Sequence, residues 1–334
     1  MDAGGIGLRT AFARQYRIGI LSRRIRRHSF VSVINKLAAI GRKAWTTSPQ
    51  EFVRLATKRI SGQRGLAVED ILRSPKYLRP QRFQDFLTRY EAILERAAGW
   101  QRLDFAGAAV LEIGCGPLLG FGPLALFRGC ASYTAIEPYF DATLIASEAI
   151  RNAYFLPLFK DLSAIYGERM TYDAFLGRLQ KDTRVLRVPI HTATNEGQRR
   201  FDAVLSNSCL EHLDPLAESI AHLKTLCSDD ARFLHLVDFG NHRTSANPFS
   251  GIYSNLPHDY RRKYGRGINL ARPPDLLRLF RENGFGAELQ PYYWSREHYA
   301  EHMLPYWKER YSDSDLFLKT AIVFGSGSTA VTPR

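Results

Sequence analysis

Residues 110–117, Val-Leu-Glu-Ile-Gly-Cys-Gly-Pro, constrain the fold of this chain more than any other stretch. The apolar run over 108–113 is typical of a buried parallel strand. Gly114 and Gly116 then permit a tight turn and close approach of a ligand to the backbone, because glycine has no Cβ. A helical pattern begins near Leu118. A strand, a glycine turn and a helix start, in this order, indicate an open α/β sheet that binds a nucleotide-like ligand at the turn.

Two acidic residues narrow the choice of that ligand. Leu119 stands where a pyrophosphate-binding Gly-x-Gly-x-x-Gly requires its third glycine, so the dinucleotide fingerprint fails. Glu112 would repel a phosphate but suits a ligand that carries an ammonium and a sulfonium group. A second apolar run over 133–136 ends in Glu137, at the place where a carboxylate commonly holds ribose hydroxyls.

The pattern Glu112-x-Gly114-x-Gly116, followed by Glu137, resembles the first motifs of class I S-adenosylmethionine (SAM)-dependent methyltransferases. The segment 201–213 is similar to the fourth-strand motif of the same family. The resemblance covers about residues 105–325 and implies SAM as cofactor. The cofactor-binding residues that it implies are Glu112, Gly114, Cys115, Gly116, Glu137, Pro138, Asn207, Ser208 and His212. A helix cap at Ser208 and a packed histidine at His212 are the open alternatives.

The expected fold class is α/β, a Rossmann-like seven-stranded sheet that is mostly parallel with an antiparallel last strand. An N-terminal helical extension and a helical insertion add to it. Outside the two motifs, the pattern predicts helices over 118–128, 273–283 and 296–309, and strands near 185–190, 232–239, 287–293 and 317–324.

Charge is distributed unevenly along the chain. The first 65 residues hold 14 Lys and Arg against 2 Asp and Glu, and the remainder holds 32 against 31, so the N-terminal segment carries almost all of the net charge of +13. We predict a basic helical extension over 1–65, a helical cap over 66–104, the methyltransferase-like domain over 105–325 with its insertion at about 142–182, and a flexible tail over 326–334.

The basic extension has several possible partners. An arginine cluster at 23–27 precedes an amphipathic pattern that begins at Ser29, which suits contact with an anionic membrane surface. Packing on the body, oligomer contact, a targeting segment and a nucleic-acid arm are the alternatives.

The chain has no uninterrupted apolar run of membrane-spanning length. Four cysteines without Cys-x-x-Cys spacing favour a reducing compartment. We therefore expect a cytoplasmic protein, either free or peripheral at the membrane.

Methyl transfer from a sulfonium is an in-line displacement that requires neither a metal nor a covalent intermediate, so we assign no metal ligand. A hydroxyl acceptor benefits from a general base. His242, four residues past Asp238 at the end of the fifth strand, is the first candidate, and His258 is the second. Asp238 is expected to orient the histidine or to act as a second base.

These observations together predict a SAM-dependent methyltransferase that O-methylates a small molecule or a glycan, with a lipid-linked sugar as one such acceptor. RNA methylation is an alternative, but the basic arm has few aromatic residues for base stacking, and nucleic acid is therefore an unlikely partner. A non-catalytic scaffold that retains the fold is the other alternative. The intact glycine and acid motifs argue against it.

Overall fold

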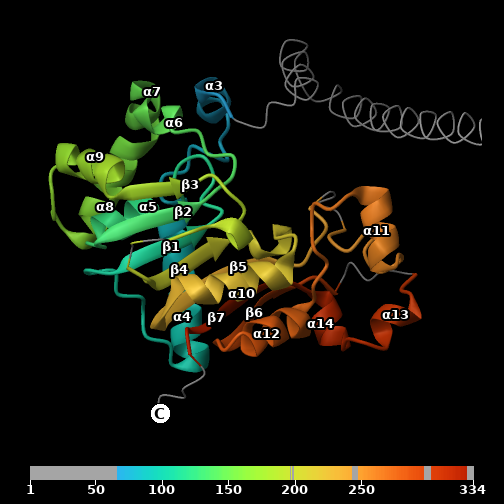
Figure 1. Cartoon of the computed structure of the whole chain (residues 1–334). Coiled ribbons are helices and arrows are strands. Elements are labelled where there is room, and N and C mark those ends of the chain that lie inside the picture. Colours follow the sequence, from blue (N-terminus) through green and yellow to red (C-terminus); the bar gives the residue numbers. More distant parts are fainter. Residues whose placement is uncertain (1–65, 196, 198, 243–246, 297–301, 329–334) are drawn as a thin grey trace, which may run out of the picture. The chain divides into compact units, whose positions relative to one another are not determined.

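The computed structural model describes residues 66–195, 197, 199–242, 247–296 and 302–328 (Figure 1). The predicted amphipathic helix and arginine cluster of segment 1–65 lie outside the described residues. No helix in the described part of the chain is both long and apolar enough to cross a membrane.

A seven-stranded sheet with the order β3-β2-β1-β4-β5-β7-β6 organises the described residues. Its strands are β1 Ala109–Ile113, β2 Ser132–Ile136, β3 Thr183–Leu186, β4 Phe201–Asn207, β5 Cys227–Asp238, β6 Gly286–Trp294 and β7 Leu318–Ser326. β3, β2, β1, β4 and β5 pair in parallel, whereas β7 runs antiparallel to both β5 and β6. The predicted Rossmann-like sheet with an antiparallel last strand is confirmed.

The central strand β1 is buried on both faces, as its continuous apolar run predicts. Val110 packs into the hydrophobic cluster on one face, and Leu111 and Ile113 pack into the cluster on the other. Because successive side chains of a strand point to opposite faces, one short run contributes to both halves of the core.

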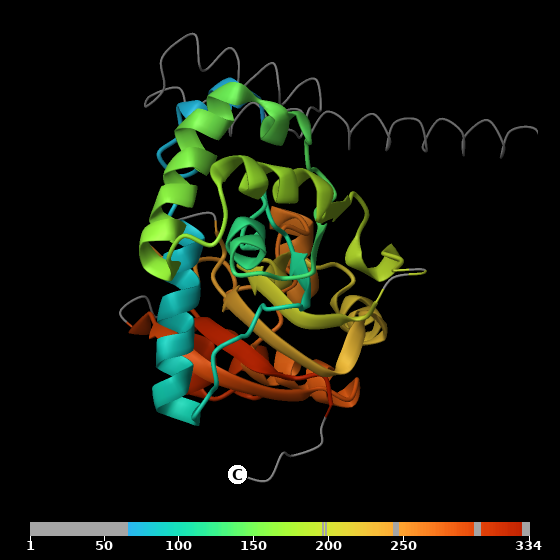
Figure 2. The ribbon, with the colours of Figure 1, turned by 90° about the vertical axis from the view of Figure 1, so that its left-hand side faces the viewer.

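Helices cover both faces of the sheet (Figure 2). One face is covered by α4 Arg82–Ala98, α5 Gly122–Phe127, α8 Leu156–Tyr166 and α9 Tyr172–Lys181, and the other by α10 Leu216–Leu226 and α12 Pro273–Glu282. Shorter segments complete this part: α3 Val68–Leu72, α6 Thr143–Ala146, α7 Glu148–Ile150, the π-helix η1 Arg151–Phe155, and the 3-10 helices η2 Ile190–Thr192 and η3 Leu210–His212.

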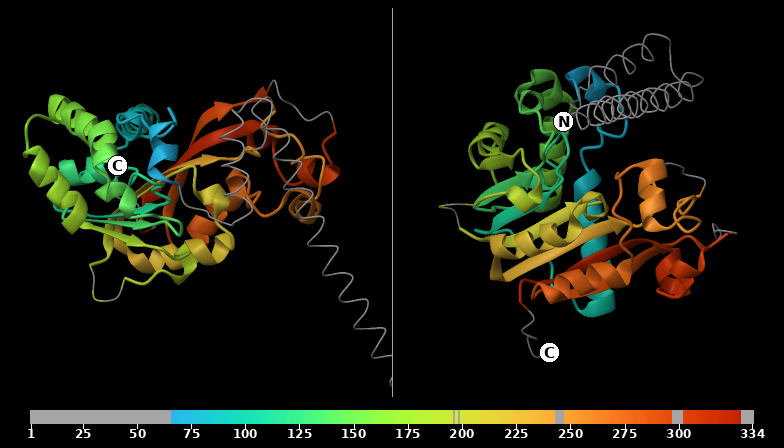
Figure 3. Two further views of the ribbon diagram at one scale, coloured as in Figure 1. Left: turned by 90° about the horizontal axis from the view of Figure 1, so that it is seen from above. Right: turned by 45° about the vertical axis from the view of Figure 1, so that its right-hand side comes forward.

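A third cluster forms at the end of the sheet away from the insertion helices (Figure 3). It is built by α11 Pro257–Tyr264, α13 Pro305–Lys308, α14 Asp313–Phe317 and the segment before α11. Its centre is Trp307, whose indole N–H donates to the backbone oxygen of Asn255 (2.9 Å) and whose ring meets that of Tyr253 edge-on.

The structure corrects several predicted boundaries. α5 begins at Gly122 rather than near Leu118, because Leu119 (φ 63°) and Gly120 (φ 46°) are left-handed and interrupt the helical pattern. β3 ends at Leu186, so the residues up to 190 are not strand.

Two corrections concern the C-terminal part. Among the described residues of 296–309, the predicted long helix is reduced to α13, and α14 was not predicted. Ser326, expected in the flexible tail, is the last residue of β7. The Gly327 N–H then donates to the Ala231 oxygen at 2.6 Å.

Candidate functional site

The glycine turn after β1 and the acid after β2 meet at the carboxyl edge of the sheet. Gly114 (φ 76°) and Gly116 (φ 65°) are both left-handed, a conformation that glycine adopts without strain. The Gly116 N–H donates to Glu137 Oε2 over 3.1 Å, and the Tyr139 N–H donates to Glu137 Oε1 over 3.3 Å. The carboxylate is thereby fixed beside the turn, where a ribose would lie.

Glu112 lies beneath this turn rather than in the wall of a pocket. Its side chain is fully buried, and Oε2 accepts from the Phe121 N–H (2.8 Å) and the Tyr133 hydroxyl (2.7 Å). Burial raises the pKa of Glu112 to about 8. This corrects the expectation that Glu112 faces the charged groups of the ligand: it positions the turn from below.

The end of β4 supplies the second wall of the site. The Asn207 Oδ1 accepts a hydrogen bond from the Tyr90 hydroxyl of α4 (2.9 Å). Ser208 follows in the left-handed region (φ 52°), and its N–H donates to the Leu236 oxygen over 2.9 Å. A non-glycine residue held at positive φ is a recurrent feature of functional sites.

These elements enclose a pocket of about 340 Å³. It is lined by Lys76, Tyr77, Arg79, Arg82, Phe83, Gly114, Cys115, Gly116, Pro117, Leu118, Tyr154, Asn207, Ser208, His212 and His242. Seven of the residues predicted from the sequence for cofactor binding or catalysis therefore line one pocket: Gly114, Cys115, Gly116, Asn207, Ser208, His212 and His242. Cys115 is buried, and burial raises the pKa of its thiol.

His242 lines this pocket from the segment after β5. Its backbone is left-handed (φ 54°), and its Nε2 lies 3.6 Å from Asp238 Oδ2. Asp238 is itself well partnered, since Oδ1 accepts from the Gly240 N–H and Oδ2 from Lys319 Nζ, each at 2.8 Å. Burial lowers the pKa of His242 despite the nearby carboxylate, which favours the neutral imidazole.

Two further side chains join His242 from η3. Glu211 Oε1 lies 3.6 Å from His242 Nε2, and burial raises the pKa of Glu211 to about 8. His212 packs its ring edge-on against that of His242, with centroids 4.9 Å apart. Its Nδ1 lies 2.5 Å from the Gly267 oxygen, which orients the ring.

Five of the residues predicted from the sequence do not line this pocket: Glu112, Glu137, Pro138, Asp238 and His258. His258 is mostly exposed in the first turn of α11, 3.3 Å from Asp259, and lines a different, arginine-rich hollow with Arg261 and Arg262. His258, the second candidate base, is therefore not brought to the glycine-turn pocket, because the first turn of α11 places it in that other hollow. Pro138 follows Glu137 but does not line the pocket either.

Several pocket residues were missed by the sequence reasoning. Lys76, Arg79 and Arg82 precede or open α4, and no carboxylate in the described part of the chain forms an ion pair with any of them. No local pattern marks these three residues as part of a site, because they do not form a continuous run of charged residues. Tyr90 lies in the segment predicted only as a helical cap, and no local pattern indicates the contact of its hydroxyl with Asn207.

An open sheet with a glycine turn after one strand and an acid after the neighbouring strand is the arrangement in which open α/β folds bind nucleotide-like ligands. A family model described as "Methyltransferase domain" matches residues 79–289, and the chain belongs to this family. It is a SAM-dependent methyltransferase.

Three solved structures illustrate the likeness, which is one of fold. A putative methyltransferase in complex with the Trm112 activator from Haloferax volcanii is 11% identical, with TM-score 0.39, over 76% of this chain and 96% of that one. A SAM-dependent methyltransferase from Mesorhizobium loti is 11% identical, with TM-score 0.40, over 71% and 97%. A putative methyltransferase from Bacillus halodurans is 12% identical, with TM-score 0.39, over 73% and 100%. No curated protein matches the chain in sequence.

The residues present fit SAM. A Cβ built on Gly116 would meet nothing within 4 Å, so the backbone here opens onto free space in which a ligand can approach. Glu137 accepts from the Gly116 N–H but does not itself line the pocket, and it would accept from ribose hydroxyls; Asn207 and Ser208 line the wall beyond the turn. Bound SAM supplies a methyl group on a sulfonium, and the electron pair of the breaking S–C bond stays on sulfur.

Proposed function

We propose that this methyltransferase transfers the methyl group to a hydroxyl oxygen of a small-molecule or glycan acceptor. The observation that carries the proposal is that His242, with Asp238 behind it, lines the same pocket as Gly116 and Asn207. An oxygen nucleophile must lose its proton as the new C–O bond forms, and groups within hydrogen-bond reach accelerate this step roughly 10²–10⁴-fold. The cluster around His242 provides such groups.

The pocket also favours an acceptor that carries negative charge. Lys76, Arg79 and Arg82 line it, and none has an acidic partner in the described part of the chain. Unpaired cations at the mouth of a pocket attract anionic ligands, and arginine binds phosphate or carboxylate in a bidentate manner. A phosphorylated or carboxylated sugar, free or lipid-linked, is therefore the acceptor chemistry that we propose.

The test is methylation of mixed acceptors by the full chain with SAM bearing an isotope-labelled methyl group, followed by mass spectrometry. Hydroxylated compounds with phosphate or carboxylate groups are expected to gain the label on oxygen in preference to their neutral counterparts. Arg79→Ala should raise KM for the anionic acceptors several-fold. Arg96→Ala removes an exposed arginine in the last turn of α4 and should leave KM unchanged. Label only on nitrogen, or no preference for charge, would overturn the proposal.

If the acceptor is held at a membrane, the basic segment 1–65 would bring the enzyme to that membrane. Each Lys or Arg near an anionic lipid surface contributes about 1 kcal/mol of attraction. We propose peripheral contact through the arginine cluster at 23–27. The full chain should sediment with vesicles that contain anionic lipid, and a variant with Arg23, Arg24, Arg26 and Arg27 changed to glutamine should remain in the supernatant. Equal sedimentation of the two proteins would exclude this role.

A further inference from the structure

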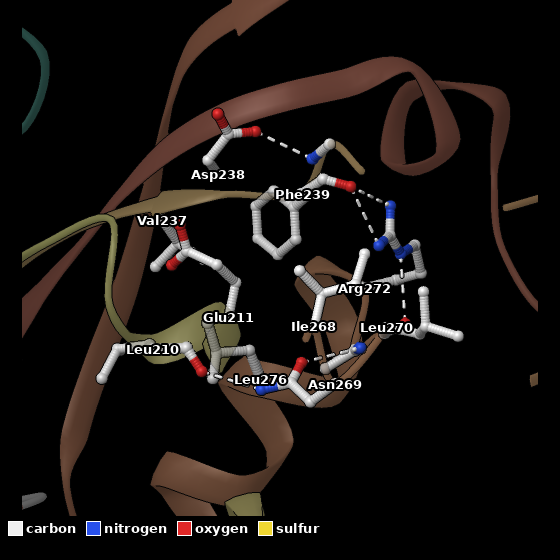
Figure 4. A pocket seen from close by; sticks show the side chains of 12 residues that line it. Leu210, Glu211, Val237, Asp238, Phe239, Ile268, Asn269, Leu270, Arg272 and Leu276 are labelled. Carbon is white, nitrogen blue, oxygen red and sulfur yellow. Dashed lines mark hydrogen bonds between the residues drawn. The ribbon is translucent and has the colours of Figure 1, made fainter. Parts of the chain in front are cut away.

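Glu211 is a buried carboxyl group whose one ion-pair contact among the described residues is with the imidazole of His242. Its side chain is 5% exposed, and neither carboxylate oxygen has a hydrogen-bond partner in the part of the chain that the structure describes. It shares a small pocket with Arg272, whose guanidinium donates to the Phe239 and Leu270 oxygens and to Tyr253 (Figure 4). Figure 4 shows hydrogen bonds at Arg272 and Asp238 but none at the Glu211 carboxylate. A buried charged group costs several kcal/mol unless a cation or donors compensate it.

Two imidazoles face the same point. Glu211 Oε1 and His242 Nε2 are 3.6 Å apart, beyond the usual hydrogen-bond length but close to the separation of about 3–4 Å between two ligands of one metal ion. His212 contributes the third group, and one ligand atom from each of the three residues lies within 4.8 Å of the others. The contact of His212 Nδ1 with the Gly267 oxygen leaves Nε2 as its free ligand atom. Metal-ligating histidines are commonly oriented by such a bond from the second ring nitrogen.

We propose that Glu211, His212 and His242 form a binding site for a divalent transition-metal ion at the end of the pocket where His212 and His242 lie. Two nitrogens and one carboxylate suit Zn²⁺, Mn²⁺, Fe²⁺ or Co²⁺, whereas Mg²⁺ and Ca²⁺ prefer all-oxygen ligand sets. The bound cation would neutralise the buried charge of the Glu211 carboxylate, which has no hydrogen-bond partner in the described residues. Asp238 stays outside the ligand set, because Lys319 and the Gly240 N–H already engage both of its oxygens.

This metal site rests on the proposed function in one respect, because it explains how Glu211, His212 and His242 would activate the acceptor hydroxyl. Three protein ligands leave positions open for a hydroxyl oxygen, and a bound cation lowers the pKa of such a group. The O–H bond would break with its proton leaving to solvent water, and the oxygen lone pair would form the bond to the methyl carbon as the S–C bond breaks and its electron pair stays on sulfur. With the ion bound, His242 would be a ligand rather than the base.

The experiment uses Co²⁺ as the probe, added to the full-length protein after treatment with EDTA and dialysis. Visible d–d absorption reports nitrogen ligation, and it does so without SAM or an acceptor. We expect a saturable 1:1 signal for the wild type. Glu211→Gln, His212→Asn and His242→Asn should each weaken Co²⁺ binding by roughly 10-fold or more, because the loss of even an outer-shell partner costs roughly 10–100-fold. His258→Asn, which also removes an imidazole beside a carboxylate, should bind like the wild type.

The outcomes separate the two proposals. Absence of a saturable Co²⁺ signal in the wild type, or equal binding by the wild type and His242→Asn, overturns the metal site and leaves O-methylation open. Co²⁺ binding without any O-methyl product overturns the proposed function and leaves the site. Because Glu211 is buried, Glu211→Gln could unfold. His212→Asn changes an exposed side chain, and its circular dichroism, expected to match the wild type, keeps the ligand test decisive.

Discussion

The backbone N–H of Gly116 and the carboxylate of Glu137, 21 residues apart in the chain, are joined by a 3.1 Å hydrogen bond at the edge of the sheet. The bond couples the turn after β1 to the end of β2. A ligand that places its ribose against Glu137 thereby meets the glycine backbone in a fixed geometry. Preorganisation of this kind lowers the cost of ordering the site on binding.

The first prediction concerns Glu137. Glu137→Ala removes the acceptor for ribose hydroxyls and frees the Gly116 N–H, and a hydrogen bond to a charged group contributes about 1.5–3 kcal/mol. We expect SAM affinity, measured by calorimetry, to fall roughly 10–100-fold while the protein stays folded. Glu148→Ala, an exposed acid on α7, is the control and should bind SAM like the wild type. Unchanged affinity in Glu137→Ala would place the ribose elsewhere.

A second prediction compares two glycines with nearly the same backbone. Gly107 (φ 70°) and Gly116 (φ 65°) are both left-handed, and a Cβ at either meets nothing within 4 Å. Alanine at each should therefore cost a similar backbone penalty of about 1–2 kcal/mol in the free energy of unfolding. SAM binding should be lost only in Gly116→Ala, because only that Cβ projects where the ligand lies. Equal SAM affinity in the two variants would contradict this placement.

The sheet could be predicted from the sequence because its strands are short apolar runs followed by glycine or by an acid. The α5 start and the end of β3 were not, since a positive φ at Leu119 and the pairing of β3 with β2 are set by tertiary structure. The glycine turn, Glu137, Asn207 and His242 could be proposed from the sequence because each lies at or after the carboxyl end of a strand, at the ligand-binding edge.

The remainder of the site depends on contacts that no local pattern encodes. Glu112 and Glu211 look alike in sequence as acids in apolar surroundings, and only the structure shows that one carries hydrogen bonds and the other has none in the described residues. His258 was a reasonable candidate by distance along the chain, but the start of α11 directs it into another hollow.

The third prediction concerns the pH dependence of stability. The pKa of Glu112 is raised in the fold to about 8 from an ordinary 4.5. The folded state therefore holds a proton that the unfolded state releases, so this contribution is fully present below pH 4.5 and is lost as the pH rises through 8. The loss is about 1.4 kcal/mol per pH unit.

Glu112→Gln isolates that contribution. The difference in unfolding free energy between the two proteins, from urea titrations at several pH values, should be constant below pH 4.5. It should then shift in favour of the variant up to about pH 8. Glu211 and the buried His235 titrate equally in both proteins and cancel. A difference that stays flat across the range would mean that Glu112 is ionised in the folded protein.

The last prediction tests the link between α4 and the cofactor wall. Tyr90 is 1% exposed, and its hydroxyl donates to Asn207 Oδ1. Tyr90→Phe leaves this oxygen without its partner, which should cost about 1–3 kcal/mol of stability and release the Asn207 side chain. We expect kcat/KM for methyl transfer to fall several-fold.

Tyr166→Phe is the matched control, because its hydroxyl also donates to an α4 side chain, Gln84 (2.8 Å), outside the pocket lining. That variant should lose similar stability but keep kcat/KM. An equal loss of kcat/KM in both variants would show that α4 acts only through overall stability and not through Asn207.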